Sequence, residues 1–217
     1  MREPSTTELL ESEVALAADE RPDTLILACG AVAREVLALI RLNGWTHVDL
    51  RCLPAKLHST PEKIAPAVDA KLTELIPRYE RVFVAYADCG TAGTLDAYLE
   101  REGLARIEGA HCYEFYAGAA AYEALQDEEI GTFYLTDFLA RQFDSIIWSG
   151  LGLDRHPELL PMYFENYRRV VYLAQSDDPE LTARAEAAAD RLGLAFERRQ
   201  TGFGDLEPSI RLAAGAA

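Results

Sequence analysis

The segment TLILACG at residues 24–30 decides how we expect this chain to fold. Residues 24–28 form a continuous apolar run, which is typical of a strand that is buried on both faces of a sheet. Cys29 and Gly30 end the run, and apolar residues then recur with helical spacing from residue 31 to residue 42. The segment therefore predicts a buried strand, a tight turn and a helix, which together begin a parallel βαβ unit.

The same alternation of strand and helix continues along the chain. Further strands are expected at residues 47–53, 81–86, 131–137, 169–174 and 194–199, with a weaker one within 105–114. Helices are expected at residues 62–76, 93–102, 117–127, 157–167 and 181–192. This order predicts an α/β fold, with a mostly parallel sheet and helices on both faces in a three-layer, Rossmann-like arrangement.

The chain contains no linker rich in proline, glycine or serine that would divide it. We therefore expect a single α/β domain over residues 23–212. Apolar residues recur with rough helical spacing before the break at Arg21 and Pro22, so residues 1–22 are expected to form an N-terminal helical extension.

The composition excludes several classes of protein. With 21 Lys+Arg against 36 Asp+Glu, the 217 residues carry a formal charge of −15, which disfavours a nucleic-acid partner because such binding rests largely on basic side chains. No run of 18 uncharged apolar residues occurs and the N-terminus is polar, so neither a membrane span nor a signal peptide is expected. The protein is expected to be cytoplasmic, where cysteine thiols are normally reduced.

Three of the four cysteines lie where predicted strands end. Ligands of open α/β sheets bind at the carboxyl ends of the strands, and Cys29, Cys89 and Cys112 each follow a strand, whereas Cys52 lies within one. The spacings match no zinc ribbon or ferredoxin pattern, so the expectation rests on topology alone. We predict that the three thiols hold Zn²⁺ or, alternatively, an iron–sulfur cluster, with His58 or Glu114 as a fourth ligand.

Two other interpretations of these cysteines remain open. Each thiol can be a small buried hydrophobe, or one of them can act as a metal-free nucleophile, which the N-terminus of a following helix would favour. Gly30 and Gly90 directly follow Cys29 and Cys89, and we expect them either to allow close approach of a cofactor or only to permit tight turns.

Three residues farther along the chain are candidate catalytic groups. Asp137 ends a predicted strand, and Asp154 and His156 flank Arg155 in a loop bordered by glycine. They are expected to act in proton transfer or substrate orientation, with helix capping as the alternative for Asp137 and a solvated loop position as that for His156. No Walker sequence or Gly-x-Ser-x-Gly motif is present, which disfavours nucleotide binding and serine hydrolysis.

Several short segments together give the chain a family resemblance. They are LACGA (27–31), LPAKLH (53–58), PEKI (61–64), DCGT (88–91), GAHCYE (109–114), GTFYLTDFL (131–139) and GLDRHP (152–157). Over about residues 24–205 the chain resembles the family catalogued as domain of unknown function 1638. The resemblance implies that Cys29, His58, Cys89 and Cys112 occupy recurring positions of that family, some of whose members are associated with corrinoid-dependent methyl-transfer systems.

From these observations we expect a metal-binding protein with a cysteine-rich site at the strand ends. If it is an enzyme, zinc would activate the thiol of a small-molecule substrate for methyl transfer. The alternatives are a non-catalytic accessory protein that docks on a corrinoid methyltransferase through its acidic surface, and a metal-free cysteine enzyme. Assembly as a homo-oligomer is left open.

Overall fold

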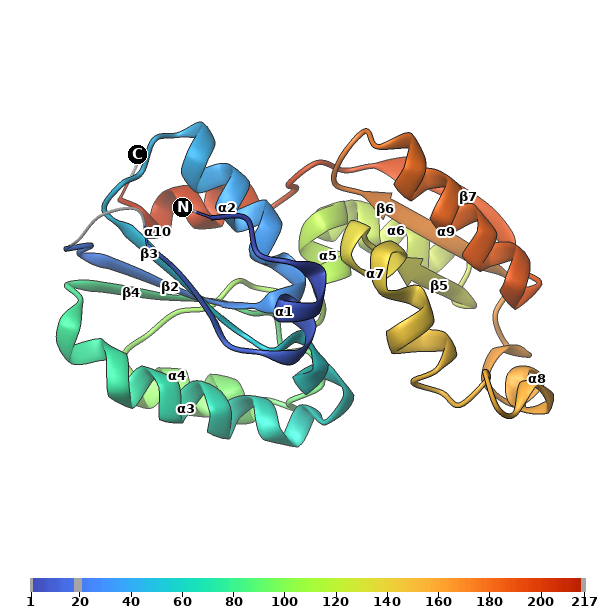
Figure 1. Cartoon of the computed structure of the whole chain (residues 1–217), viewed down its shortest axis with the longest axis horizontal. Coiled ribbons are helices and arrows are strands. Elements are labelled where there is room, and N and C mark those ends of the chain that lie inside the picture. Colours follow the sequence, from blue (N-terminus) through green and yellow to red (C-terminus); the bar gives the residue numbers. More distant parts are fainter. Residues whose placement is uncertain (1, 18–20, 216–217) are drawn as a thin grey trace. The chain divides into compact units, whose positions relative to one another are not determined.

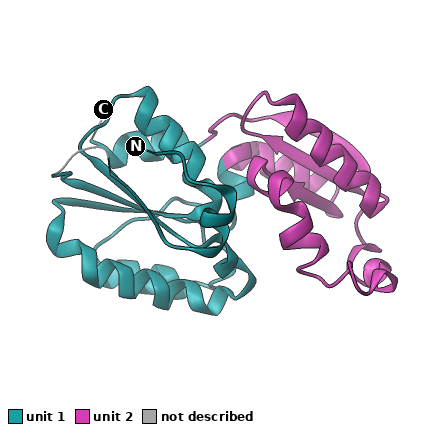
Figure 2. Ribbon diagram, viewed as in Figure 1, with its two compact units in different colours: residues 1–115, 205–217 teal, residues 116–204 magenta. Residues whose placement is uncertain are grey.

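The computed structural model describes residues 2–17 and 21–215. The chain folds into two compact units, one made of residues 1–115 and 205–217 and the other of residues 116–204 (Figure 2). Each unit contains one sheet.

The first unit, here unit 1, contains a four-stranded sheet. Its helices and strands, in chain order, are α1 (Thr6–Glu11), β1 (Val14–Ala17), β2 (Thr24–Cys29), α2 (Ala33–Leu42), β3 (Val48–Leu53), α3 (Ile64–Leu75), β4 (Arg81–Ala85), α4 (Thr94–Glu102) and α10 (Leu206–Ala213). The strand order is β1-β3-β2-β4, in which β2 pairs in parallel with both β3 and β4 while β1 pairs antiparallel with β3. Helices α2 and α10 cover one face of this sheet, and α3 and α4 cover the other (Figure 1).

The direction of winding reverses at β2. The chain passes from β2 through α2 to β3 on one side and then returns through α3 to β4 on the other side. Because crossovers between parallel strands are right-handed, α2 and α3 lie on opposite faces of the sheet. The connections that leave the sheet therefore diverge between the ends of β2 and β4. This reversal point, at the carboxyl ends of the strands, is where open α/β sheets bind their ligands.

The second unit, unit 2, contains a three-stranded parallel sheet in the order β5-β6-β7. Helix α5 (Cys112–Ala117) spans the boundary, and the remaining elements are α6 (Ala119–Glu128), β5 (Thr132–Leu135), α7 (Asp137–Gln142), a π-helix (Phe143–Trp148), α8 (Leu160–Phe164), β6 (Arg169–Ala174), α9 (Pro179–Leu192) and β7 (Ala195–Gln200). Helices α7 and α9 pack together, and apolar side chains of β5 and β6 form a core with them. On the other face of β5, the Tyr134 hydroxyl donates a hydrogen bond to Gln126 of α6 at 3.1 Å.

The structure confirms the α/β class, the alternation of strands with helices and the predominance of parallel pairing, since only β1 pairs antiparallel among the described strands, but the strands do not form one sheet. The strands form two sheets, and the sheet of unit 1 is mixed because β1 runs antiparallel. Within the expected helical extension, only residues 6–11 are helical among those described. Residues 14–17 form β1 instead, since pairing with β3 buries Val14 and Leu16 and overrides the weak helical spacing.

Smaller differences concern the middle and the end of the chain. The weak strand expected within residues 105–114 is reduced to a single bridge between Arg106 and Val84, and Cys112 already begins a helix. Helix α10 was not expected. The domain boundaries at residues 22 and 212 stay a prediction.

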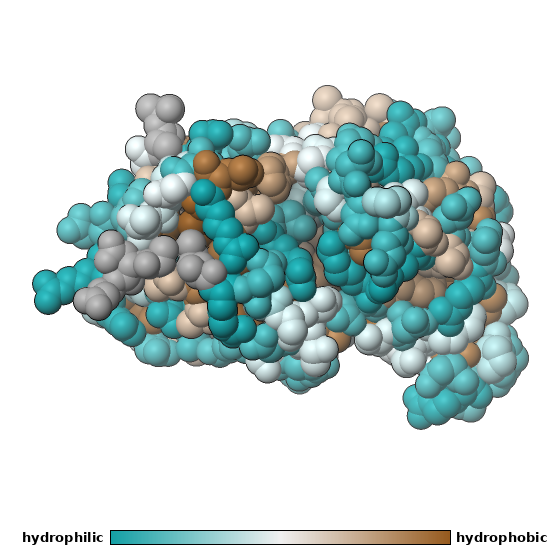
Figure 3. All heavy atoms as spheres, turned by 45° about the horizontal axis from the view of Figure 1, so that its top comes forward, coloured by the Kyte–Doolittle hydropathy of each residue, from teal (hydrophilic) through white to brown (hydrophobic). Residues whose placement is uncertain are grey.

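The surface agrees with the composition. On the face shown in Figure 3, hydrophilic side chains predominate and apolar ones form smaller patches. Within the described part of the chain, no helix is both long enough and apolar enough to cross a membrane.

Candidate functional site

The three thiols predicted to form a site do come together in unit 1. Cys29 is the last residue of β2, Cys89 lies in the loop that follows β4, and Cys112 is the first residue of α5. The Cys112 thiol interacts electrostatically with those of Cys89 and Cys29, and Cys89 interacts with Cys29. We call these three residues the thiol cluster.

Two backbone hydrogen bonds bring Cys112 to the strand ends. The amide of Cys89 donates to the carbonyl of Ala110 at 2.8 Å, and the amide of Asp88 donates to Gly109 at 3.0 Å. The loop after β4 is thereby joined to the segment that leads into α5. Cys112 follows Ala110 by only two residues, so its position near Cys89 results from this pairing.

The loop after β4 is held in a strained conformation by Asp88. Its carboxylate accepts hydrogen bonds from the amides of Gly90, Ala92 and Gly93 at 3.1–3.3 Å and from the Thr91 hydroxyl at 2.7 Å. Burial acts to raise the pKa of Asp88, but these hydrogen bonds outweigh it and lower the pKa overall. Cys89 and Ala92 have φ angles of 52° and 53°, which non-glycine residues adopt at a cost of roughly 1–3 kcal/mol each and which cluster at functional sites.

The thiols of the cluster are protonated in this environment. Burial raises the pKa of Cys89 to about 12 and also raises those of Cys29 and Cys112, and repulsion between the sulfurs adds to the effect at Cys89 and Cys112. Cys52 is buried in β3, as expected, and burial raises its pKa as well. Because the thiolate is the nucleophile and the metal ligand, these thiols are unreactive unless a positive charge joins them.

Two histidines lie next to each other beside this region of unit 1. His58 lies in the short 3₁₀ segment after β3, and burial, together with its neighbour His111, lowers its pKa, so its imidazole is neutral near pH 7. The Nδ1 atom of His111 is buried and has no hydrogen-bond partner among the described residues. An imidazole nitrogen of this kind is available to a ligand.

Glu114, the alternative fourth ligand, is already engaged. Its carboxylate accepts a hydrogen bond from the Ala110 amide at 2.8 Å and lies against Gly109, which has a φ of 113°. The carboxylate that does approach the cluster is Glu35 of α2, which is 7% exposed and interacts with the Cys112 thiol. No sequence signal marks Glu35, because acidic residues are common in the first turn of a helix.

The two glycines that follow thiols have packing roles in the structure. A side chain at Gly30 would place its Cβ atom 2.1 Å from the carbonyl oxygen of Leu9, so α1 fills that space. Gly90 has a φ of 82° and lies against Pro61. Both contacts fit the alternative in which the glycines only permit tight local packing.

A cleft adjoins the loop that carries Cys89. It is lined by Pro61 and Ala65 at the start of α3, by Gly90 and Thr91 of the loop, and by Tyr98 of α4. A small molecule bound there would lie beside the residue that follows Cys89.

The three candidate catalytic residues belong to unit 2. Asp137 is 1% exposed, and its carboxylate accepts hydrogen bonds from the Tyr172 hydroxyl at 2.7 Å and from the amides of Gln175 and Ser176 at 3.0 and 3.1 Å. The Ser176 hydroxyl donates a fourth. Asp137 therefore ties the end of β5 to the end of β6.

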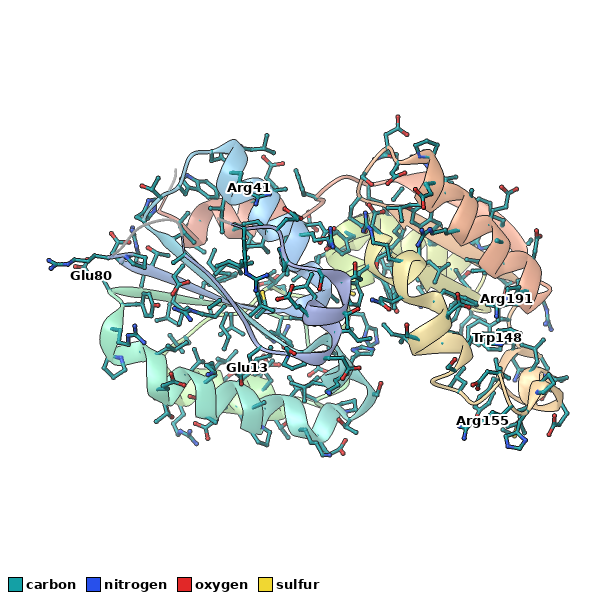
Figure 4. The ribbon with its side chains drawn as sticks, in the orientation of Figure 1. Glu13, Arg41, Glu80, Trp148, Arg155 and Arg191 are labelled. Atoms are coloured by element: carbon teal, nitrogen blue, oxygen red, sulfur yellow. The ribbon has the colours of Figure 1, made fainter. Side chains whose placement is uncertain are left out.

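Asp154 and His156 lie on the surface of unit 2. His156 contacts Glu158, with 3.2 Å between Nδ1 and the carboxylate, and Asp154 lies 3.8 Å from Arg155. Figure 4 shows Arg155 at the outer end of this loop and, elsewhere in the unit, Arg191 beside Trp148, whose ring centre is 4.1 Å from the guanidinium carbon. Both side chains are exposed to solvent.

The metal expectation meets a clear limit in the geometry. Within residues 2–17 and 21–215, no group of three or more His, Cys, Asp or Glu side chains is arranged so that it could hold a metal ion.

Fold and site together define a class: an α/β protein with three neighbouring thiols beside the carboxyl ends of parallel strands. The chain matches the family model described as "Protein of unknown function (DUF1638)" over residues 52–210, and it belongs to that family. The matched range includes His58, Cys89 and Cys112 and begins after Cys29. No curated protein and no solved structure matches the chain.

Proposed function

We propose that unit 1 binds a thiophilic metal ion, zinc in the first instance, through Cys29, Cys89 and Cys112. The observation that carries the proposal is the proximity of three thiols from three separate segments, beside the carboxyl ends of the parallel strands β2 and β4. A cation offsets the burial and mutual repulsion that keep these thiols protonated, because a coordinating thiol loses its proton to the metal. Binding requires the three side chains to turn toward a common point.

The fourth position is best supplied by the imidazole of His111. Its Nδ1 atom is buried and lacks a partner, and a buried polar atom of this kind calls for an unseen water or ion. His58, which is neutral and adjacent, is the alternative nitrogen ligand. Glu114 is a poor candidate because its carboxylate closes the turn before α5.

The metal-free cysteine enzyme is the weaker alternative. A nucleophilic cysteine needs a lowered pKa, whereas burial raises the pKa of every thiol in the cluster. Without a metal these thiols would be inert core residues.

The reaction that we attach to the site is methyl transfer involving a thiol, for which bound zinc would keep a sulfur nucleophile deprotonated at neutral pH. Only the family resemblance supports this step. The cleft beside Gly90 would hold the small-molecule substrate, and a corrinoid methyltransferase protein is the proposed partner if the protein is not itself an enzyme. We also propose that the arrangement of unit 1 is Rossmann-like, from its reversal of winding at β2, and that the protein is cytoplasmic, which would keep the thiols reduced.

The test is metal analysis of the protein purified without oxygen. We expect stoichiometric zinc by elemental analysis, whereas a broad visible absorption with stoichiometric iron would indicate a cluster instead. Replacing Cys29, Cys89 or Cys112 by serine should remove the metal. The matched control is Cys52→Ser, a buried cysteine of the same sheet, which should retain it.

Two results would overturn the proposal. The first is a wild-type protein that contains no metal and binds none when zinc is added after reduction. The second is loss of metal in Cys52→Ser but in none of the other three variants.

A further inference from the structure

The cleft beside Gly90 lies between α3 and α4, two helices of unit 1 that pack together. It has a volume of about 640 Å³, and part of its wall is apolar, including Pro61 and Ala65. Its charged side chains are Glu62, Asp69 and Arg101. The cleft can therefore select a ligand by charge as well as by size.

The chain already places a cation of its own in this cleft. The guanidinium of Arg101 lies over the ring of Tyr98, with 4.9 Å between its carbon atom and the ring centre. It pairs with Glu102 at 3.0 Å and lies within electrostatic reach of Asp69. Because the face of an aromatic ring attracts a cation, this part of the cleft has the chemistry of a cation site.

Asp69 provides a fixed negative charge beside the ring. Its carboxylate accepts a hydrogen bond from the Tyr98 hydroxyl and another, at 3.4 Å, from the Thr73 hydroxyl. Burial raises the pKa of Tyr98, and the charge of Asp69 raises it further, so the phenol stays neutral. Because both donors are neutral, they position the carboxylate without cancelling its charge.

Arg101 can leave the ring at little cost. Its side chain is 64% exposed, and its partner Glu102 is the next residue of the same helix. Exposed ion pairs of this kind contribute little to stability. A ligand that carries its own positive charge can therefore take the place of the guanidinium, while Arg101 turns toward solvent.

We propose that this cleft binds a small aliphatic ammonium compound, whose charged group replaces the Arg101 guanidinium over Tyr98 beside Asp69. The apolar part of the ligand would lie along Pro61 and Ala65. The inference rests on the proposed function only in placing the substrate in this cleft, and it does not depend on a metal. With two carboxylates and one guanidinium in the wall, and a formal charge of −15 on the whole chain, the field also favours a cation.

The probes are three molecules of similar size that differ in charge: n-butylammonium, n-butanol and butyrate. NMR titration of the full chain follows their binding. We expect n-butylammonium to shift the amide signals of Gly90 and Thr94, which line the cleft, in a saturable manner. n-Butanol should bind more weakly and butyrate more weakly still. Added salt should weaken the binding of n-butylammonium, because the attracting charges are partly exposed.

The first pair of variants is Asp69→Asn and Glu74→Gln. Each removes one negative charge from α3, but only Asp69 lines the cleft. Asparagine keeps an oxygen that can accept the hydrogen bond of Tyr98. We expect Asp69→Asn to bind n-butylammonium about 5-fold more weakly, the upper end for a partly exposed charge pair, and Glu74→Gln to bind it as wild type does. The unchanged signals of unit 2 show that each variant is folded.

The second pair, Arg101→Gln and Arg78→Gln, tests the displacement itself. Each removes one positive charge, but Arg78 is an exposed residue after α3 that does not line the cleft. Because Arg101→Gln removes the competing cation, it should bind n-butylammonium about 3-fold more tightly, in keeping with an exposed cation over a ring. Arg78→Gln should change the affinity little. A cleft that instead used Arg101 to hold an anion would respond with the opposite sign.

Four results would each overturn the proposal. They are the absence of saturable binding of n-butylammonium, binding of butyrate at least as tight, equal effects of Asp69→Asn and Glu74→Gln, and weaker binding of n-butylammonium by Arg101→Gln. The metal analysis tests the thiol cluster separately. A chain that holds zinc but fails these titrations would lose only the ammonium site, and a zinc-free chain that passes them would lose only the metal site.

Discussion

The carboxyl ends of the two sheets use buried polar groups in opposite ways. In unit 2, the Asp137 carboxylate accepts four hydrogen bonds from residues at the end of β6 and just beyond it. In unit 1, the buried Nδ1 atom of His111 has no hydrogen-bond partner among the described residues, and burial raises the pKa of the thiols near the strand ends. A satisfied buried network makes a structure rigid, whereas an unsatisfied one costs free energy and persists where a ligand supplies what is missing.

The comparison also separates two kinds of hydrogen-bonded carboxylate. Both Asp137 and Asp88 follow a strand, and each accepts four hydrogen bonds from nearby residues. Asp137 joins two strands of a sheet, whereas Asp88 holds only its own loop. The first is expected to govern the stability of its unit, and the second the position of Cys89.

The largest expected effect is that of Asp137→Ala. The substitution leaves a buried tyrosine hydroxyl and two buried amides without an acceptor, so we expect a loss of about 3 kcal/mol in the free energy of unfolding. Urea unfolding followed by tryptophan fluorescence measures it, because Trp148 lies in unit 2. The control is Asp154→Ala, an exposed aspartate of the same unit. Equal stability of the two variants would show that the Asp137 network does not hold the strands.

We expect Asp88→Ala to lower the free energy of unfolding by a smaller amount, about 2 kcal/mol, because the loop that Asp88 stabilises is partly exposed.

The contribution of Asp88 to stability depends on pH with a defined sign. The folded state lowers the pKa of Asp88, so the stabilisation by its charge is complete above the unfolded pKa of about 4 and is lost as the pH falls through the lowered value. The difference in unfolding free energy between wild type and Asp88→Asn, measured in urea from pH 7 to pH 3, should be constant at first and then shrink. A difference that grows toward low pH would contradict this account.

The smallest expected effect concerns the strain at Cys89. A φ of 52° costs a residue with a Cβ atom about 1 kcal/mol, so Cys89→Gly should be more stable than Cys89→Ala by about that amount. Urea unfolding of the two variants measures the difference, which is free of any effect of the lost sulfur because both lack it. If Cys89→Ala is the more stable variant, the backbone at residue 89 is not strained. The carboxyl ends of the two sheets would then differ only in their hydrogen bonding.

Most of the elements could be predicted from the sequence, because buried strands such as β2 and β6 are continuous apolar runs and their helices have clear periodicity. The division into two sheets could not be predicted, since it depends on which strands pair, and pairing joins residues far apart in the chain. The short segment that forms β1 becomes a strand only because β3 offers it an edge.

The part of the site that depends on the ends of the strands could be predicted from the sequence. The rule that ligands bind at strand ends selected Cys29, Cys89 and Cys112, and the structure brings these thiols near one another. Glu114 was selected for its chemistry, but a local hydrogen bond to Ala110 uses its carboxylate instead.

The position of helix α10 in the chain affects the order in which the two units can finish folding. It packs on α2 and β4, and the amide of Asp205, just before it, donates to the carbonyl of Phe115 at 2.7 Å. Unit 1 is therefore built from two separate stretches of the chain, residues 1–115 and 205–217, with the whole of unit 2 synthesised between them. Since domains generally fold as they emerge, unit 2 can finish folding while unit 1, with its four cysteines already made, still waits for its last helix.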